Sequence, residues 1–189
     1  MKKNALWILL SIPGILLTKE AYEGTGEYEM LMHTSGEFSA RLLIISLIAT
    51  PLLVLFPKGK LSKWLLRNRR YFGVAAFGYA LLHTIIYLYV IEWITVQKEF
   101  FDFAILTGWI AFFIFLPLAI TSNDYSIGRM RKSWKKLQRW VYLAALCTFA
   151  HWVFVHYNYM SALIHFVPVM LLQVARVWKN KETRNPNFQ

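Results

Sequence analysis

Four long stretches of the sequence carry almost no charged residues, and they limit the folds that the chain can adopt. They are residues 38–56, interrupted only by Arg41, and residues 71–91, 103–123 and 140–175. A helix needs about 20 apolar residues to cross a bilayer, so the first three stretches each predict one crossing and the last predicts two. The stretches do not alternate polar and apolar residues, which argues against membrane strands. A chain that is 57% hydrophobic, with a mean hydropathy of +0.40, also has more apolar surface than a soluble domain of 189 residues can bury.

A shorter apolar segment, Ala5–Leu17, follows Lys2 and Lys3, which suits either a signal peptide or a first membrane helix. The residues after it, TKEAYEGTG, contain no good small-x-small cleavage site, so we expect an uncleaved helix. The predicted fold is therefore an all-α membrane protein, a bundle of six transmembrane helices. We expect this membrane domain to span residues 1–178 and a solvated tail to span residues 179–189.

The charged residues fall into two groups of connections. All but three of the 21 lysines and arginines lie before residue 4, in residues 57–70, in residues 128–139 or from Arg176 onward, whereas eight of the ten acidic residues lie in residues 20–37 and 92–102. Basic connections remain on the cytoplasmic side, so both termini are predicted to be cytoplasmic in a multi-pass protein of the inner (plasma) membrane. The net charge of +11 needs no nucleic acid, because anionic membrane lipid is a sufficient partner for it.

Two histidines stand in the middle of these apolar stretches. His83 is 13 residues beyond Arg70, and His151 is 12 residues beyond Arg139, the last charged residues before each predicted helix. Both helices run from the cytoplasm outwards, and at 1.5 Å per residue both rings would lie roughly 18–20 Å along their axes. The two imidazoles are therefore predicted at the same depth, somewhat beyond the middle of the membrane.

One buried neutral histidine can simply hydrogen-bond to a neighbouring helix. Ionisable residues inside a membrane more often mark a functional site, however, and two imidazoles at one depth can bind a haem iron from opposite faces. Zinc would take three or four nitrogen or sulfur ligands, and the single cysteine, Cys147, is the one further donor nearby. The hypothesis from these residues is one b-type haem, with His83 and His151 as the iron ligands.

Further candidates lie towards the predicted outer boundary. Arg41, the one charge inside a predicted span, either extends to the interface or pairs with a haem propionate, and both interpretations stay open. His33, His156 and His165 all fall near that boundary. They are either interfacial residues or a cluster that guides a metal ion, an electron acceptor or a proton.

Three stretches in a fixed order carry a resemblance to a known family. Residues 33–52 contain His-x-x-Gly, a basic residue and Thr-Pro-Leu; residues 67–87 contain Arg-Arg-x-x-Gly and then His83; residues 118–154 contain Thr-Ser, a basic loop with tryptophan and then His151. This set resembles the ferric-reductase-like transmembrane domain family. It is most similar to the branch of haem-binding membrane subunits in bacterial periplasmic methionine sulfoxide reductase systems. The resemblance extends from about residue 5 to residue 178.

The resemblance implies transfer of electrons across the membrane through haem at His83 and His151. The donor would be a membrane quinol or a cytoplasmic flavin reductase, with quinone or FMN as the further cofactor. The acceptor would be a periplasmic, molybdenum-containing methionine sulfoxide reductase. Where the family usually has a histidine that is linked to a second haem, this chain has Gln138. An amide is a poor haem ligand, so we expect a single haem.

Two other functions stay open on the sequence alone. The same haem domain could reduce ferric or cupric ions at its outer face, with the outer histidines as a landing site. A haem-free permease or assembly scaffold would use the buried histidines only for bonds between helices, although the sequence shows neither a buried carboxylate nor the paired broken helices of many transporters. The sequence has no glycine-rich nucleotide-binding loop, so a flavin or nicotinamide donor would be another chain.

Overall fold

The computed structural model describes residues 3–156 and 159–183, and every regular element among them is an α-helix. The longer helices in these residues are α1 (Lys3–Glu23), α2 (Tyr28–Leu55), α3 (Lys60–Val90), α5 (Phe103–Ile120), α8 (Val141–His156) and α9 (Tyr159–Glu182). Shorter helices of seven residues lie in the connections: α4 (Trp93–Glu99), α6 (Asp124–Met130) and α7 (Lys132–Gln138). The predicted all-α fold is confirmed for the described residues.

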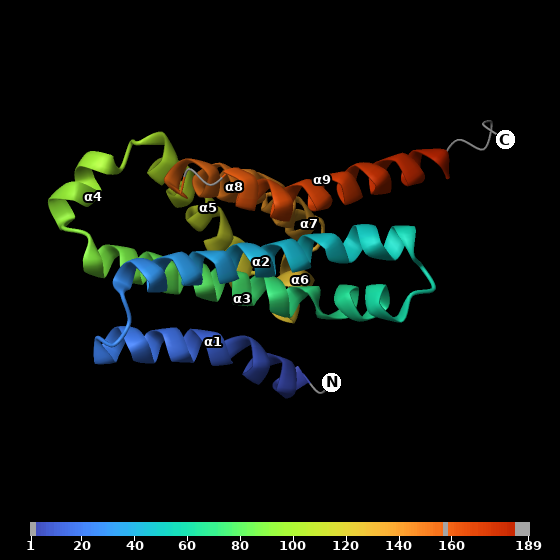
Figure 1. Ribbon diagram of the computed structural model, residues 1–189. Helices are drawn as coiled ribbons and strands as arrows, with labels where there is room; N and C mark the ends of the chain where they lie inside the picture. Colours follow the sequence, from blue (N-terminus) through green and yellow to red (C-terminus); the bar gives the residue numbers. More distant parts are fainter. Residues whose placement is uncertain (1–2, 157–158, 184–189) are drawn as a thin grey trace.

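Two antiparallel helix pairs form the centre of the bundle. α2 packs along α3, α5 packs along α8, and α9 lies against both α2 and α8. α3 also contacts α5, so the two pairs share an interior. Figure 1 shows α1 set apart beside α3, with α5 and α8 on the far side of the α2–α3 pair.

Five helices are long and apolar enough to cross a membrane, namely α1 from Ala5 onward, α2, α3, α5 and α9. α8 has 16 residues, and a rise of 1.5 Å per residue gives it about 24 Å, less than the roughly 30 Å of a hydrocarbon core. The chain is therefore a multi-pass membrane protein. The count of six crossings stays a prediction.

Two helices begin well before the apolar stretches that predicted them. α2 begins at Tyr28, so His33 and Glu37, which were expected outside the second span, lie within the helix. α3 begins at Lys60, and residues 60–70, expected as a basic loop, form its first turns. Hydropathy marks the part of a helix that lipid surrounds, whereas the backbone hydrogen-bond ladder continues into the polar boundary.

The basic and acidic connections lie at opposite ends of the bundle. In Figure 1 the α2–α3 connection, the start of α1 and the end of α9 lie towards the right, whereas the α1–α2 connection and α4 lie towards the left. An ion pair of 2.6 Å between Arg70 and Asp124 joins α6 to the basic part of α3. This separation agrees with the charge pattern, and the assignment of the basic end to the cytoplasm stays a prediction.

α1 is attached to the bundle through Tyr79 of α3. α1 contains Pro13, which has no backbone N–H, and Figure 1 shows that the ribbon of α1 is bent. The Tyr79 hydroxyl accepts from the Gly14 N–H at 2.8 Å and donates to the Leu10 carbonyl at 2.9 Å. It thus replaces the helix's own hydrogen bond between these two residues. This contact makes α1 a packed part of the fold.

α9 is tied to α2 by two long polar side chains. The Gln173 amide donates to the Leu47 carbonyl at 3.1 Å, and the Lys179 amino group donates to the Leu55 carbonyl at 3.3 Å. Leu55 ends α2, where unpaired carbonyls favour a cation. Lys179, the first residue of the expected tail, therefore packs with the bundle, and residues 184–189 of that tail lie outside the described residues.

Candidate functional site

His83 of α3 and His151 of α8 lie next to each other inside the bundle. Their ring centroids are 6.2 Å apart and their ring planes are at 84°. The structure therefore brings together the two residues that the sequence predicts at one depth. If two imidazole nitrogens bound one metal ion from opposite sides, each at about 2.0–2.1 Å, the ring centroids would be roughly 6.3 Å apart. The observed separation fits one metal ion shared by both rings.

Each ring is oriented by a backbone carbonyl of a neighbouring helix. His83 Nδ1 lies 2.8 Å from the Met32 carbonyl of α2, and His151 Nδ1 lies 2.7 Å from the Ala104 carbonyl of α5. A carbonyl can only accept, so Nδ1 of each neutral ring donates its proton and Nε2 keeps its lone pair. Metal-binding histidines commonly have this arrangement, which fixes the ring and makes it a stronger ligand. Both rings can therefore bind a metal through Nε2.

A glycine opposite each ring makes room for it. Gly36 and Gly108 each follow the accepting carbonyl by one helical turn. A Cβ atom at Gly36 would lie 3.2 Å from Nδ1 of His83, and a Cβ atom at Gly108 would lie 2.7 Å from Nδ1 of His151. Real Cβ atoms essentially never make contacts under 3.0 Å, so a side chain at position 108 would push the ring away from its carbonyl.

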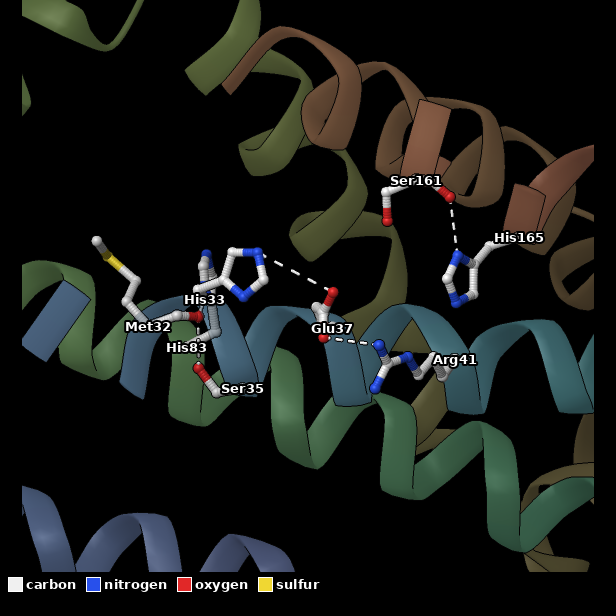
Figure 2. A network of polar contacts seen from close by, with 8 residues as sticks. All are labelled: Met32, His33, Ser35, Glu37, Arg41, His83, Ser161 and His165. Carbon is white, nitrogen blue, oxygen red and sulfur yellow. Dashed lines mark hydrogen bonds and ion pairs between the residues drawn. The ribbon is translucent and has the colours of Figure 1, made fainter. Parts of the chain in front are cut away.

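A hydroxyl group beside each glycine donates to the same carbonyl. The Ser35 hydroxyl donates to Met32 at 2.9 Å, as Figure 2 shows, and the Thr107 hydroxyl donates to Ala104 at 2.8 Å. The α2–α3 and α5–α8 pairs thus hold their histidines in the same way. One helix supplies a carbonyl, a hydroxyl and a glycine at positions i, i+3 and i+4, and its partner supplies the histidine. Sequence reasoning gave none of these four residues this role, although Gly36 is the glycine of the His-x-x-Gly motif in residues 33–52.

The cavity beside the rings lies between the two helix pairs and has a volume of about 120 Å³. Its lining includes aromatic residues of α5 and α8, among them Trp109, Phe112 and Trp152. A planar macrocycle could enter this narrow space only if some of these side chains changed rotamer. The two neighbouring imidazoles and the largely apolar walls are nevertheless the chemistry that a b-type haem requires.

Tyr87 gives the cavity a polar group of its own. It lies one turn after His83 on α3 and lines the cavity. Its hydroxyl is buried and has no hydrogen-bond partner among the described residues. A buried hydroxyl without a partner is costly, so it marks a place where a polar group of a ligand would bind. Sequence reasoning missed this tyrosine because aromatic residues are common throughout the spans.

His33, Glu37 and Arg41 lie one after another along α2 (Figure 2), and the first two line the cavity. Glu37 is 2.7 Å from Arg41, and its other carboxylate oxygen is 4.0 Å from His33 Nε2. The Glu37 side chain is only 20% exposed, and both Glu37 and His33 line the cavity. The sequence interpretation placed Glu37 in an outer connection and so missed a half-buried carboxylate. Arg41 is paired with this carboxylate, and its role towards a haem propionate stays a prediction.

Of the other two outer histidines, only the His165 side chain is described. His165 Nδ1 is 2.8 Å from the Ser161 carbonyl of its own helix (Figure 2), and its ring lies 5.2 Å from that of Trp152. His156 ends α8, and its side chain is outside the described part of the chain. Within residues 3–156 and 159–183, no group of three or more His, Cys, Asp or Glu residues is placed to hold a metal ion.

Gln138 and Cys147 do not line the cavity of the paired histidines. The Gln138 amide donates to the Leu118 carbonyl at 3.2 Å and to the Thr121 hydroxyl at 3.4 Å, so it ties the end of α7 to the end of α5. Cys147 is buried but does not line the histidine cavity. The structure therefore gives Gln138 a packing role, and the expectation of a single haem stays a prediction.

Comparison with known proteins agrees with these observations. A family described as ferric reductase like transmembrane component matches residues 35–149, a range that contains His83 and ends two residues before His151. The protein-methionine-sulfoxide reductase heme-binding subunit MsrQ of Caulobacter vibrioides is 28% identical over 187 residues, which cover 94% of this chain and 87% of the relative. The proteins of the same name from Brucella ovis and Brucella anthropi are 29% and 31% identical, over 78% and 64% of this chain and 70% and 54% of theirs. No solved structure matches the chain.

Proposed function

This chain belongs to the ferric reductase like transmembrane component family, and on that premise we propose that it binds one b-type haem and serves as an electron-transfer subunit. The observation that carries the proposal is the pair of imidazoles at 6.2 Å, each oriented through Nδ1 by a backbone carbonyl, so that Nε2 is the nitrogen that would bind a metal. Its relatives are named as heme-binding subunits of a methionine sulfoxide reductase, which supports the same conclusion.

The chain's own residues orient the ligands and exclude water. His83 and His151 would hold the iron, and the carbonyls of Met32 and Ala104 keep both Nδ1 protons in place. Haem supplies one-electron exchange when it is bound. A hydrogen bond from Nδ1–H to a carbonyl makes the imidazole a stronger electron donor, which favours the ferric state and lowers the reduction potential.

We infer the direction of transfer and the partners from the family resemblance and the relatives' names. The donor is a membrane quinol or a cytoplasmic flavin reductase at the basic end. The acceptor is a periplasmic, molybdenum-containing methionine sulfoxide reductase at the acidic end. An outer-face ferric or cupric reductase is less supported, because the described residues contain no three-ligand group that could receive the metal ion.

The proposal is tested by absorption spectra of the full chain, purified in detergent from cells supplied with haem. We expect a Soret band, a sharp b-type α band after reduction with dithionite, and one haem per chain. A folded preparation that remains colourless would contradict the proposal and favour a permease or scaffold. Mixing the reduced protein separately with a methionine sulfoxide reductase and with ferric citrate, and following the loss of the α band, distinguishes the two acceptors.

Tyr87→Phe should alter the haem site without removing it. The substitution deletes the buried, unpartnered hydroxyl and keeps the ring that lines the cavity. If that hydroxyl binds a polar substituent of the haem, redox titration should show a changed midpoint potential, and haem should dissociate roughly 5–20-fold faster, as expected for one lost hydrogen bond. Tyr89→Phe, on an exposed tyrosine two residues away, is the matched control and should change neither quantity. Identical behaviour of both variants would show that Tyr87 does not contact the haem.

A further inference from the structure

A second cavity lies at the basic end of the bundle, apart from the paired histidines. Its volume is about 430 Å³, and residues from all helices except α1 and α4 surround it. Its lining includes six cationic residues, which are Arg67, Arg69, Arg70, Lys135, Arg139 and Arg176. In the part of the chain that the structure describes, no acidic residue lines it.

Among the residues that the structure describes, one of the six cations forms an ion pair with a carboxylate. Arg70 pairs with Asp124 at 2.6 Å. Two other arginines donate to neutral hydroxyls: Arg69 donates to Thr50 at 3.1 Å, and Arg176 donates to Tyr142 at 3.2 Å. A hydroxyl oxygen accepts a hydrogen bond from a guanidinium N–H group but does not neutralise the positive charge of the guanidinium. Several like charges around one cavity produce a strong local potential that attracts an anion.

Apolar side chains, some of them buried, also line the cavity. Leu43 and Leu47 of α2 line it together with Leu66 and Phe77 of α3, whereas Arg67, Arg69, Lys135 and Arg139 are exposed and lie at its mouth. Phe115 lines both this cavity and the histidine cavity, and Phe77 stacks on Phe112 at 5.9 Å between ring centroids. An aromatic layer therefore separates the two sites, and the basic cavity is a site of its own. Exposed cations together with buried apolar side chains in one cavity favour an amphipathic anion as its ligand.

We propose that this cavity binds a phosphate group, carried either by the head group of an anionic phospholipid or by a soluble phosphate compound. Guanidinium groups bind phosphate oxygens through paired hydrogen bonds, and five of the six cations are arginines. Basic pockets between membrane helices on the cytoplasmic side bind anionic lipid head groups. The proposal does not depend on haem binding, and its test measures no redox activity.

α7 and the residue after it provide a matched pair of variants. Lys135 and Arg139 line the cavity, whereas Lys132 and Lys136 do not. Both pairs are four residues apart in the same short segment, so Lys135→Gln/Arg139→Gln and Lys132→Gln/Lys136→Gln remove the same charge from the same place in the chain. All four side chains are exposed, so both double variants should fold.

The experiment places the full chain in nanodiscs of equimolar phosphatidylcholine and phosphatidylglycerol and then measures the lipid retained after detergent extraction, by native mass spectrometry. Phosphatidylglycerol retention should fall at least about tenfold in Lys135→Gln/Arg139→Gln and stay within about twofold of the unmodified chain in Lys132→Gln/Lys136→Gln. Calorimetric titration with inorganic phosphate and glycerol 3-phosphate forms the second arm.

The two arms identify the source of the phosphate. Selective loss of phosphatidylglycerol alone gives a lipid site, and selective loss of soluble phosphate binding gives a soluble ligand; both results support the proposal. Equal losses in the two double variants would show general attraction to a basic surface and would overturn it, as would no loss in either. If the cavity variant does not fold, Arg67→Gln, on α3 at the mouth of the same cavity, replaces it with the same expected direction.

Discussion

Replacement of His83 or of His151 by alanine is expected to leave the purified protein almost without haem. Each change removes one imidazole of the adjacent pair and leaves the other in a cavity whose walls are mostly apolar. Loss of an iron ligand should exceed the 10–100-fold cost typical of a lost outer-sphere contact, so haem content should fall by at least about tenfold. The measurement is the reduced-minus-oxidised α band per mole of protein.

His165→Ala is the matched control for these two variants. His165 is also a half-buried histidine, but its Nδ1 is bonded to the Ser161 carbonyl of its own helix and it does not line the cavity. We expect unchanged haem in this variant and unchanged helix content by circular dichroism in all three. Wild-type haem content in either His83→Ala or His151→Ala would end the assignment of these two residues as ligands.

Gly108→Ala is expected to have nearly as large an effect, although it changes neither ligand. The added methyl carbon would lie 2.7 Å from Nδ1 of His151, so the ring must leave the Ala104 carbonyl that orients it. Alanine favours a helix over glycine by about 1 kcal/mol, so α5 itself should not be weakened. We therefore expect haem content to fall by about tenfold or more while the thermal unfolding midpoint of the haem-free protein stays the same or rises.

Two other glycines provide graded controls for this prediction. At Gly36 the methyl carbon would lie 3.2 Å from Nδ1 of His83, a contact that a small shift can relieve, so Gly36→Ala should lower haem content less. At Gly78 nothing lies within 4 Å, and Gly78→Ala should leave haem unchanged. The expected order of haem loss is position 108, then 36, then 78. A different order would show that space beside the imidazoles does not control haem binding.

The relative height of two residues along the bundle could be predicted from the sequence. The spacing of His83 from Arg70 and of His151 from Arg139 placed both rings at one level, and the structure puts them side by side. Helix ends were predicted less well, because an apolar stretch does not end where its helix ends. For that reason Glu37 was assigned to an outer connection, although it lies on α2 at the edge of the cavity.

Four features could be inferred without coordinates: the class of fold, the apolar segments, the division of charge between the two ends, and the pair of histidines at matched height along the bundle. They can be inferred because the thickness of a bilayer and the fixed rise of a helix convert the spacing of residues in the sequence into a distance along the helix axis. The rotation of each helix about its axis, and so the side that faces its neighbour, could be seen in the folded structure but not in the sequence. These helices are apolar on nearly all sides, so their sequences contain no polar face from which the buried side could be predicted. The roles of Gly108, Ser35 and Tyr87, and the gathering of cations from α3, α7 and α9 around one cavity, therefore became visible only in three dimensions.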